Sequence, residues 1–340
     1  MPVSLVTGGA GFMGSHVVES LLSAGHDVVV LDDMSGGFET NVPAGATFVR
    51  GSVVDHAMIE GLFAQYGFTY VYHLAAYAAE GLSHFIKRFN YTNNLIASIN
   101  LINAAVNHDV DCFVFTSSIA VYGAAQPPMT EDVTPTPEDS YGIAKLAVEL
   151  ELAVSQAMFG LDYVIFRPHN VYGERQNIGD RYRNVVGIFM NQLLRGEPMT
   201  IFGDGTQTRA FTHISDVASI VAESVQVPAA RNEIFNVGSD QSHTVNYLAQ
   251  VVAQVMGCEC RVQHLDARQE AKDVFSDHRK IERVFGTRKT ISLEDGVRRM
   301  AAWVKQHGAR SSSVFRGIEI SRNLPPSWQQ ATITYETARE

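Results

Sequence analysis

The sequence predicts an α/β protein whose core is a doubly wound parallel sheet. Apolar segments of strand length alternate with segments of helical periodicity over the first half of the chain, as they do in βαβ units. A glycine-rich turn at residues 8–14 joins the first strand to the first helix. The 340 residues are 46% hydrophobic and 18% charged, which is typical of globular proteins with a large core.

Strands and helices are predicted from the period of the apolar residues. The predicted strands are 3–7, 27–33, 46–53, 70–77, 112–118 and 162–168, with a later one at 232–239. The predicted helices are 14–26, 57–66, 90–108, 139–160 and 244–257.

The alternation weakens after Pro168, which suggests a change of domain. We expect residues 1–168 to form a dinucleotide-binding domain, joined by a returning segment at about 211–240. Residues 169–310 are expected to form mainly a substrate-binding domain. Residues 311–340 lack clear periodicity and are expected to be a surface-bound or loose tail.

Charge and cysteine content exclude several classes of protein. The net charge is −10 and no run of Lys or Arg exceeds two residues, so a nucleic-acid-binding surface is not expected. Cys112, Cys258 and Cys260 are too few for a disulfide framework and favour a reducing compartment. A predicted strand already begins at Val3, and no apolar stretch reaches the length of a membrane span. The sequence therefore predicts a cytoplasmic protein that does not associate with membranes.

The glycine-rich turn has the features of a dinucleotide-binding loop. Gly8, Gly11 and Gly14 follow a strand and open a helix, so that backbone and helix amides can approach a pyrophosphate. Asp32 ends the second strand, where a carboxylate can bind both ribose hydroxyls. That carboxylate would repel a 2′-phosphate, so NAD is favoured over NADP. Asp33 could share this role.

Tyr141 and Lys145 are four residues apart on a predicted helix and therefore lie on one face. Alone, such a pair is more often an ordinary helix surface. Beside the glycine turn, Asp32 and the hydroxyl of Ser118, it suggests a phenol that moves protons. A lysine about 5 Å away stabilises the phenolate by roughly 3 kcal/mol at a dielectric of about 20. This would lower the tyrosine pKa from about 10 to about 8, and an oxidised nicotinamide would lower it further.

Four motifs together resemble the extended short-chain dehydrogenase/reductase superfamily, in its nucleotide-sugar epimerase and dehydratase branch. They are TGGAGFMGS (7–15), TSSIAVYG (116–123), YGIAK (141–145) and RPHNVYG (167–173). The resemblance to UDP-glucose 4-epimerases runs from about Val3 to about Gly286. It implies a Rossmann-type sheet with a smaller α/β substrate-binding domain, NAD as cofactor, a UDP-sugar substrate and a homodimer.

The resemblance also implies roles for individual residues. Tyr141 would be the acid/base, Lys145 its partner and Ser118, rather than its neighbour Ser117, the hydroxyl that binds the reacting oxygen. The implied cofactor-binding residues are Gly8, Gly11, Phe12, Met13, Gly14, Asp32, Asp33, Ser52, Val53, Leu74, Ala75, Ala76, Asn94, Tyr141, Lys145 and Pro168. The implied substrate-binding residues are Ser118, Tyr141, Asn170, Phe202, Arg209 and Arg268.

Two positions decide between reaction types within this branch. The dehydratases carry adjacent Asp and Glu residues where this chain has Ile119 and Ala120. Neither side chain can move a proton, so epimerisation at C4 is favoured over a 4,6-dehydration. UDP-glucose/UDP-galactose is the leading substrate pair. UDP-glucuronate and UDP-N-acetylhexosamines stay open as substrates, as does a non-catalytic NAD-sensing relative.

Departures from the branch leave the sugar uncertain. Ser52 stands where an acid usually contacts adenine. Val274 takes the place of a bulkier gate residue, which would admit an N-acetyl group. Asn177 holds the position of an arginine that could bind a uronate, although Arg175, Arg181 and Arg183 are near in sequence.

Two further expectations concern metals and assembly. His73, His169 and His213 lack the spacing of metal ligands, so no metal is expected. The helices predicted at 91–108 and 141–158 are apolar on more than one face, which indicates a dimer interface.

Overall fold

A seven-stranded parallel sheet forms the centre of the computed structural model, which describes residues 1–267, 272–311, 315–326 and 328. The strand order is β11-β6-β5-β4-β1-β2-β3. The strands are β1 (Val3–Thr7), β2 (Asp27–Asp32), β3 (Thr47–Arg50), β4 (Tyr70–His73), β5 (Cys112–Thr116), β6 (Tyr163–Pro168) and β11 (Glu233–Val237). The order reverses beside β1, and ligands of such sheets bind at the carboxyl ends of the strands near this point.

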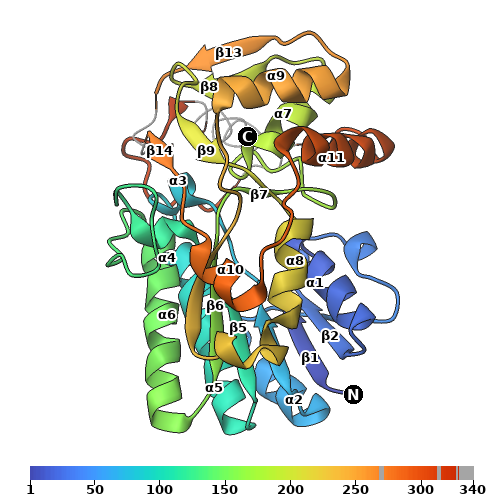
Figure 1. Cartoon of the computed structure of the whole chain (residues 1–340), viewed down its shortest axis with the longest axis vertical. Helices are drawn as coiled ribbons and strands as arrows, with labels where there is room; N and C mark the ends of the chain where they lie inside the picture. Colours follow the sequence, from blue (N-terminus) through green and yellow to red (C-terminus); the bar gives the residue numbers. More distant parts are fainter. Residues whose placement is uncertain (268–271, 312–314, 327, 329–340) are drawn as a thin grey trace, which may run out of the picture.

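Helices cover both faces of this sheet (Figure 1). They are α1 (Phe12–Ser23) and α8 (Ser215–Glu223) on one face, and α2 (His56–Tyr66), α5 (Ala97–Asn107) and α6 (Ser140–Phe159) on the other. Successive strand residues point to opposite faces, so Leu5 packs with α2 and α5 while Val6 packs with α1 and α8. Burial on both faces explains the continuous apolar runs of the strands.

A smaller layer lies over the carboxyl ends of the strands, at the top of Figure 1. Its helices are α7 (Val185–Leu194), α9 (Val245–Met256) and α11 (Leu293–His307), which share a core of their own. Its strands are β7 (Val171–Tyr172), β8 (Met199–Phe202), β9 (Thr208–Ala210), β10 (Thr212–His213), β12 (Ser242–Thr244), β13 (Val262–Leu265) and β14 (Asp273–Val274). They pair as β10-β7, β12-β9-β14 and β13-β8. The short α10 (Arg279–Phe285) leads from this layer back towards β11.

The predicted α/β architecture is confirmed, and one segment differs from the expectation. The helix expected at 90–108 is formed by α4 (Lys87–Tyr91), a π-helical turn at Thr92–Ile96 and α5. Residues 315–326 and Trp328 pack on α4 and on α3 (Glu80–Ser83), which agrees with the surface-bound alternative for this part of the tail. In the described part of the chain, none of the helices has both the length and the apolar character needed to cross a bilayer.

Candidate active site

The loop between β1 and α1 contains glycines at positions where a side chain would collide with neighbouring backbone. Because these residues have no side chain, the loop leaves space for a phosphate. Gly8 has φ 71°, and a Cβ there would lie 2.7 Å from the amide nitrogen of Ala75. A Cβ on Gly14 would lie 2.1 Å from the carbonyl oxygen of Gly8. Gly11 is the residue before α1, so the amides of Phe12 and Met13 form the free first turn. We call this loop the glycine cradle, and free amides in such an arrangement can bind an anion such as a pyrophosphate.

Asp32 lies against this cradle at the end of β2. Its Oδ2 accepts a hydrogen bond from the Ala10 amide at 3.0 Å, and its Oδ1 accepts one from the Met34 amide at 2.8 Å. Burial raises the pKa of Asp32 against the effect of these bonds. Asp33 is exposed and accepts a bond from the Ser35 amide within its own turn. Asp32 is therefore the better placed of the two for a ribose.

The carboxyl ends of β3, β4 and β6 bring the other predicted cofactor-binding residues to the same edge of the sheet. These residues are Ser52, Val53, Leu74, Ala75, Ala76 and Pro168. The Ser52 hydroxyl accepts a hydrogen bond from the Val54 amide at 3.3 Å. The Ala75 amide donates to the Thr7 hydroxyl at 3.3 Å, which fixes the backbone after β4 beside the glycine cradle.

Asn94, another predicted cofactor-binding residue, uses its side-chain amide in hydrogen bonds within the protein. It is buried in the π-helical turn, and its Oδ1 accepts a hydrogen bond from the Tyr77 amide at 2.8 Å. Its Nδ2 donates to the Tyr77 carbonyl oxygen at 3.2 Å and to Oδ1 of Asn90 at 2.7 Å. The amide group therefore holds the loop that follows β4.

Ser118, Tyr141 and Lys145 come together where β5 and α6 meet. Ser118 precedes the 3₁₀ turn Ile119–Tyr122, and its hydroxyl hydrogen-bonds to the side chain of Tyr141. Tyr141 and Lys145 lie one turn apart on α6, with Nζ of the lysine 5.7 Å from the centroid of the phenol ring. All three side chains are buried. The arrangement is that of a proton-transferring phenol with a hydroxyl and an amine beside it.

The expected acidification of Tyr141 is wrong for the protein without ligands. Burial is the main cause that raises the pKa of its phenol, and the charge of Glu80 raises it further. Burial also lowers the pKa of Lys145 to about 7, which the charge of Glu149 opposes. The expectation of a lowered pKa considered only the attraction between the phenolate and the ammonium group. Both groups also lose hydration on burial, and this loss disfavours their charged forms. The phenol is thus a proton donor at neutral pH and becomes a base only when positive charge is added nearby.

The lowered pKa of Lys145 predicts a pH dependence of stability. Between pH 7 and about 10.5 the unfolded chain binds a proton that the folded chain does not bind, so this lysine makes the folded state more stable as pH rises. We expect the Tm of the wild type, relative to that of Lys145→Met, to rise from pH 6.5 to 9.5. Parallel Tm curves for the two proteins would contradict a buried, deprotonated amine.

Behind Lys145 lies a buried ion pair that sequence reasoning did not identify. The guanidinium of Arg167 on β6 contacts Glu149 of α6 through Nε at 3.0 Å and through Nη2 at 2.5 Å. Ser117 donates its hydroxyl proton to the same carboxylate. Tyr122 accepts a bond from Nη1 of Arg167 at 2.8 Å. Because Ser117 is engaged here, Ser118 is the serine that faces the phenol.

The predicted substrate-binding residues lie in the smaller layer and in the turn that leads to it. Asn170 is exposed after β6, and its Nδ2 donates to the Ala210 carbonyl oxygen at 3.2 Å. Arg209 on β9 donates to the carbonyl oxygens of Thr208 and Lys272. Phe202 ends β8 and is half-buried. The predicted Arg268 lies outside the described residues.

Arg183 and Glu80 act on the phenol of Tyr141, and sequence reasoning gave Glu80 no role. Arg183 stacks on Tyr77, with its guanidinium carbon 4.6 Å from the ring centroid, and its Nε pairs with Asp180 at 2.9 Å. The charge of Arg183 lowers the pKa of Tyr141, whereas that of Glu80 raises it. Two opposite charges therefore act on the phenol of Tyr141.

Two of the histidines named in the sequence analysis, His73 and His169, have protein partners on both ring nitrogens. His73 is buried between the hydroxyls of Thr7 and Ser98 at 2.7 and 2.8 Å, and burial lowers its pKa to about 3. His169 contacts His278 and the carbonyl oxygen of Ala210. Within residues 1–267, 272–311, 315–326 and 328, no cluster of three His, Cys, Asp or Glu side chains could hold a metal ion.

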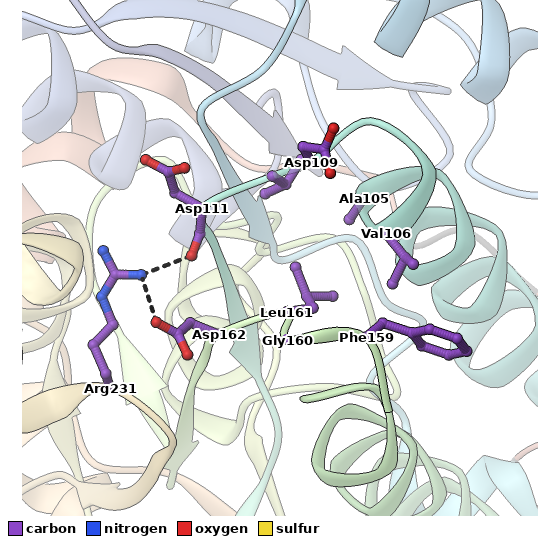
Figure 2. Close-up of a pocket in the computed structure, with 10 residues that line it drawn as sticks. Ala105, Val106, Asp109, Asp111, Phe159, Gly160, Leu161, Asp162 and Arg231 are labelled. Atoms are coloured by element: carbon purple, nitrogen blue, oxygen red, sulfur yellow. Dashed lines mark hydrogen bonds and ion pairs between the residues drawn. The ribbon is translucent and has the colours of Figure 1, made fainter. Parts of the chain in front are cut away.

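A surface hollow of about 440 Å³ lies away from this chemistry (Figure 2). Asp111 and Asp162, which line it, precede β5 and β6, so it lies at the amino ends of the strands. Arg231 spans it by donating to the Asp111 carbonyl oxygen at 2.8 Å and pairing with Asp162 at 3.5 Å. The hollow is at the edge of the sheet opposite to Tyr141.

Comparison with known proteins decides the family. The family model described as NAD dependent epimerase/dehydratase matches residues 4–238. The chain belongs to this family. It is 32% identical over 306 residues to a putative UDP-glucose 4-epimerase of Methanocaldococcus jannaschii. The match covers 89% of this chain and 98% of that relative.

Solved structures give the same relationship for this family member. The UDP-glucose 4-epimerase of Thermotoga maritima with UDP-glucose is 32% identical, with a TM-score of 0.84 over 90% of this chain and 99% of that one. The UDP-glucuronic acid 4-epimerase of Bacillus cereus, in complex with UDP-glucuronic acid and NAD, is 28% identical. Its TM-score is 0.82 over 90% of this chain and all of that one. The predicted family, its NAD dependence and the Rossmann-type fold are confirmed.

Proposed function

We propose that this protein is a UDP-sugar 4-epimerase that interconverts UDP-glucose and UDP-galactose. The observation that carries the proposal is the buried group of Ser118, Tyr141 and Lys145 at the same edge of the sheet as the glycine cradle. The relatives named UDP-glucose 4-epimerase support it. We also propose that residues 1–168 with 211–240 bind NAD, and that residues 169–310 mainly bind the sugar nucleotide.

The chemistry divides between the cofactor and the side chains of this chain. The glycine cradle and Asp32 would hold NAD, which would supply a reversible hydride acceptor for C4 of the sugar. Tyr141 takes the proton of the C4 hydroxyl and later gives it back. Ser118 holds the reacting oxygen beside the phenol. Lys145, whose Nζ donates to the Thr116 carbonyl oxygen at 2.7 Å, is fixed close enough to stabilise the phenolate.

Two residues after Ser118 argue against dehydration. Ile119 is buried against Val121 and Met129, and Ala120 is the next residue of the same turn. Removal of water from C5 and C6 of a sugar needs an acid and a base in addition to the hydride acceptor. Hydrocarbon side chains at these positions supply neither, so the sugar is reduced again at C4.

UDP-glucuronate is the second candidate substrate because of Arg183. The charge of its guanidinium lowers the pKa of Tyr141, and a guanidinium binds carboxylates well. Asn177 instead accepts a hydrogen bond from the Gly179 amide in its own turn. Glu80 opposes an acidic sugar because its charge also acts on Tyr141. Val274, which takes the place of a bulkier gate residue, packs near Ile119. Because a smaller residue there would admit an N-acetyl group, an N-acetylhexosamine is the third candidate.

Product analysis tests the function directly. The protein would be incubated separately with UDP-glucose, UDP-glucuronate and UDP-N-acetylglucosamine, and the product sugars separated. We expect UDP-galactose from UDP-glucose at the highest kcat/KM. Turnover mainly of UDP-glucuronate would support the Arg183 alternative, and release of carbon dioxide would indicate a decarboxylase. No turnover of any of the three would contradict an epimerase.

We further propose a homodimer formed through α6. Ile143, Leu150, Val154 and Met158 lie along one face of this helix and are 43–69% exposed. Ile96, in the neighbouring π-helical turn, is 51% exposed. Single exposed apolar residues are common, but a continuous stripe indicates an interface. The unpaired Cys112, Cys258 and Cys260 suit the cytoplasm, where we place the protein.

Substitution in this stripe tests the dimer. We expect the wild type to sediment at about twice 37.3 kDa and Leu150→Glu to shift the equilibrium towards the monomer, because a buried carboxylate would face an apolar partner. Glu151→Gln, at an exposed polar position of the same helix, is the matched control. A wild type that sediments only at 37.3 kDa would contradict the proposal.

A further inference from the structure

Helix α11 ends at His307, and about a tenth of the 340 residues follow it. We call residues 315–326 and 328 of this segment the C-terminal strap.

Glu319 of the strap caps α4. Its Oε2 accepts a hydrogen bond from the Arg88 amide and its Oε1 accepts one from the Phe89 amide, both at 2.8 Å. Ile86, which precedes α4, has no side-chain acceptor for these amides. A carboxylate in this position satisfies free amides and matches the helix dipole. The amides of Glu319 and Ile320 in turn donate to the carbonyl oxygen of Phe85.

Apolar contacts join the strap to two loops beside the active site. Trp328 is buried, with its ring 6.1 Å from that of Phe85 and 5.2 Å from that of Tyr182 between centroids. Phe315 packs on Tyr77 at 5.4 Å. The Phe315 amide also donates to the Tyr182 hydroxyl at 3.4 Å. The strap therefore bridges the segment 77–91 and the loop that carries Arg183.

The segment under the strap contacts the start of the catalytic helix. Ser83 of α3 accepts a hydrogen bond from the Tyr141 amide at 3.2 Å. Asn90 of α4 donates to the Ser140 carbonyl oxygen at 2.7 Å. A shift of α3 and α4 would therefore move the first turn of α6 or leave its groups unpaired.

We propose that the strap is a positioning element that sets the affinity of the enzyme for the sugar end of its substrate. It packs on Tyr77, against which Arg183 stacks, and the charge of Arg183 acts on Tyr141. The described contacts of the strap do not include the glycine cradle. Loss of the strap contacts should therefore raise KM for the sugar nucleotide and leave NAD binding unchanged. The inference rests on the proposed epimerase function.

The test compares full-length Glu319→Ala and Trp328→Ala with Arg322→Ala, an exposed position of the strap. KM and kcat would be measured with UDP-glucose, NAD affinity by calorimetry, and hydrogen exchange over residues 80–91. Both strap variants should exchange faster and show a KM raised by about tenfold, with NAD affinity within about twofold. Glu319→Gln, which keeps one acceptor oxygen, should fall between wild type and Glu319→Ala even where Trp328→Ala folds poorly.

Each other outcome is informative. Faster hydrogen exchange with an unchanged KM would show that the strap has only a structural role, and would overturn the inference. Unchanged hydrogen exchange in both strap variants would also overturn it. If the wild type turns over no nucleotide sugar, the proposed function fails and the strap is judged by the calorimetric affinity for UDP-glucose. Equal affinity in wild type and Glu319→Ala would then overturn the inference.

Discussion

Replacing Tyr141 with phenylalanine is expected to lower kcat for epimerisation by about 10²–10⁴-fold, the usual contribution of a positioned acid or base. The substitution removes a single oxygen from a side chain that is 5% exposed. The ring keeps its place beside Lys145, so the packing around β5 and α6 should survive. NAD binding should persist because the glycine cradle and Asp32 are untouched.

Tyr247→Phe is the matched control for this substitution. Tyr247 lies on α9, is 39% exposed and donates its hydroxyl proton to Glu294. We expect it to keep wild-type kcat, whereas Ser118→Ala should lose activity to a smaller extent than Tyr141→Phe. The measurements are initial rates with UDP-glucose and calorimetric NAD affinity for each protein. A fully active Tyr141→Phe would remove the phenol from the mechanism.

Local patterns made most of the fold and part of the site predictable. The strands of a buried parallel sheet are continuous apolar runs, and the glycine turn must have positive φ at Gly8. Tyr141 and Lys145 share a helix face because 3.6 residues make a turn. Each of these relations spans only a few residues, so the sequence order alone expresses it.

The features that sequence reasoning missed depend on contacts between distant residues. Glu319 and Arg88 are 231 positions apart, and nothing near either one indicates the other. The direction of the Tyr141 pKa shift depends on burial by the whole fold rather than on its spacing from Lys145. The same holds for the effect of Arg183, which lies in a loop without periodic pattern, on the pKa of Tyr141.

Removing the charge of Glu149 is expected to have the largest effect on stability. Glu149 and Arg167 each have side chains only 2% exposed, so Glu149→Gln leaves a buried guanidinium without a counter-charge. The new amide NH₂ would also face the N–H donors of Arg167. Breaking a buried pair in this way costs about 3–5 kcal/mol, which lowers Tm by roughly 10 °C in a domain of this size.

The double variant Glu149→Met, Arg167→Met separates charge from volume. With both charges gone, no buried charge is left unpaired and only the Ser117 hydroxyl loses its acceptor, so the Tm of this variant should exceed that of Glu149→Gln. Loss of Glu149 also removes the charge that raises the pKa of Lys145, so the amine should titrate below pH 7 in both variants. The pH profile of kcat/KM should shift accordingly. If Glu149→Gln kept the Tm and the pH profile of the wild type, the ion pair would neither stabilise the fold nor act on Lys145.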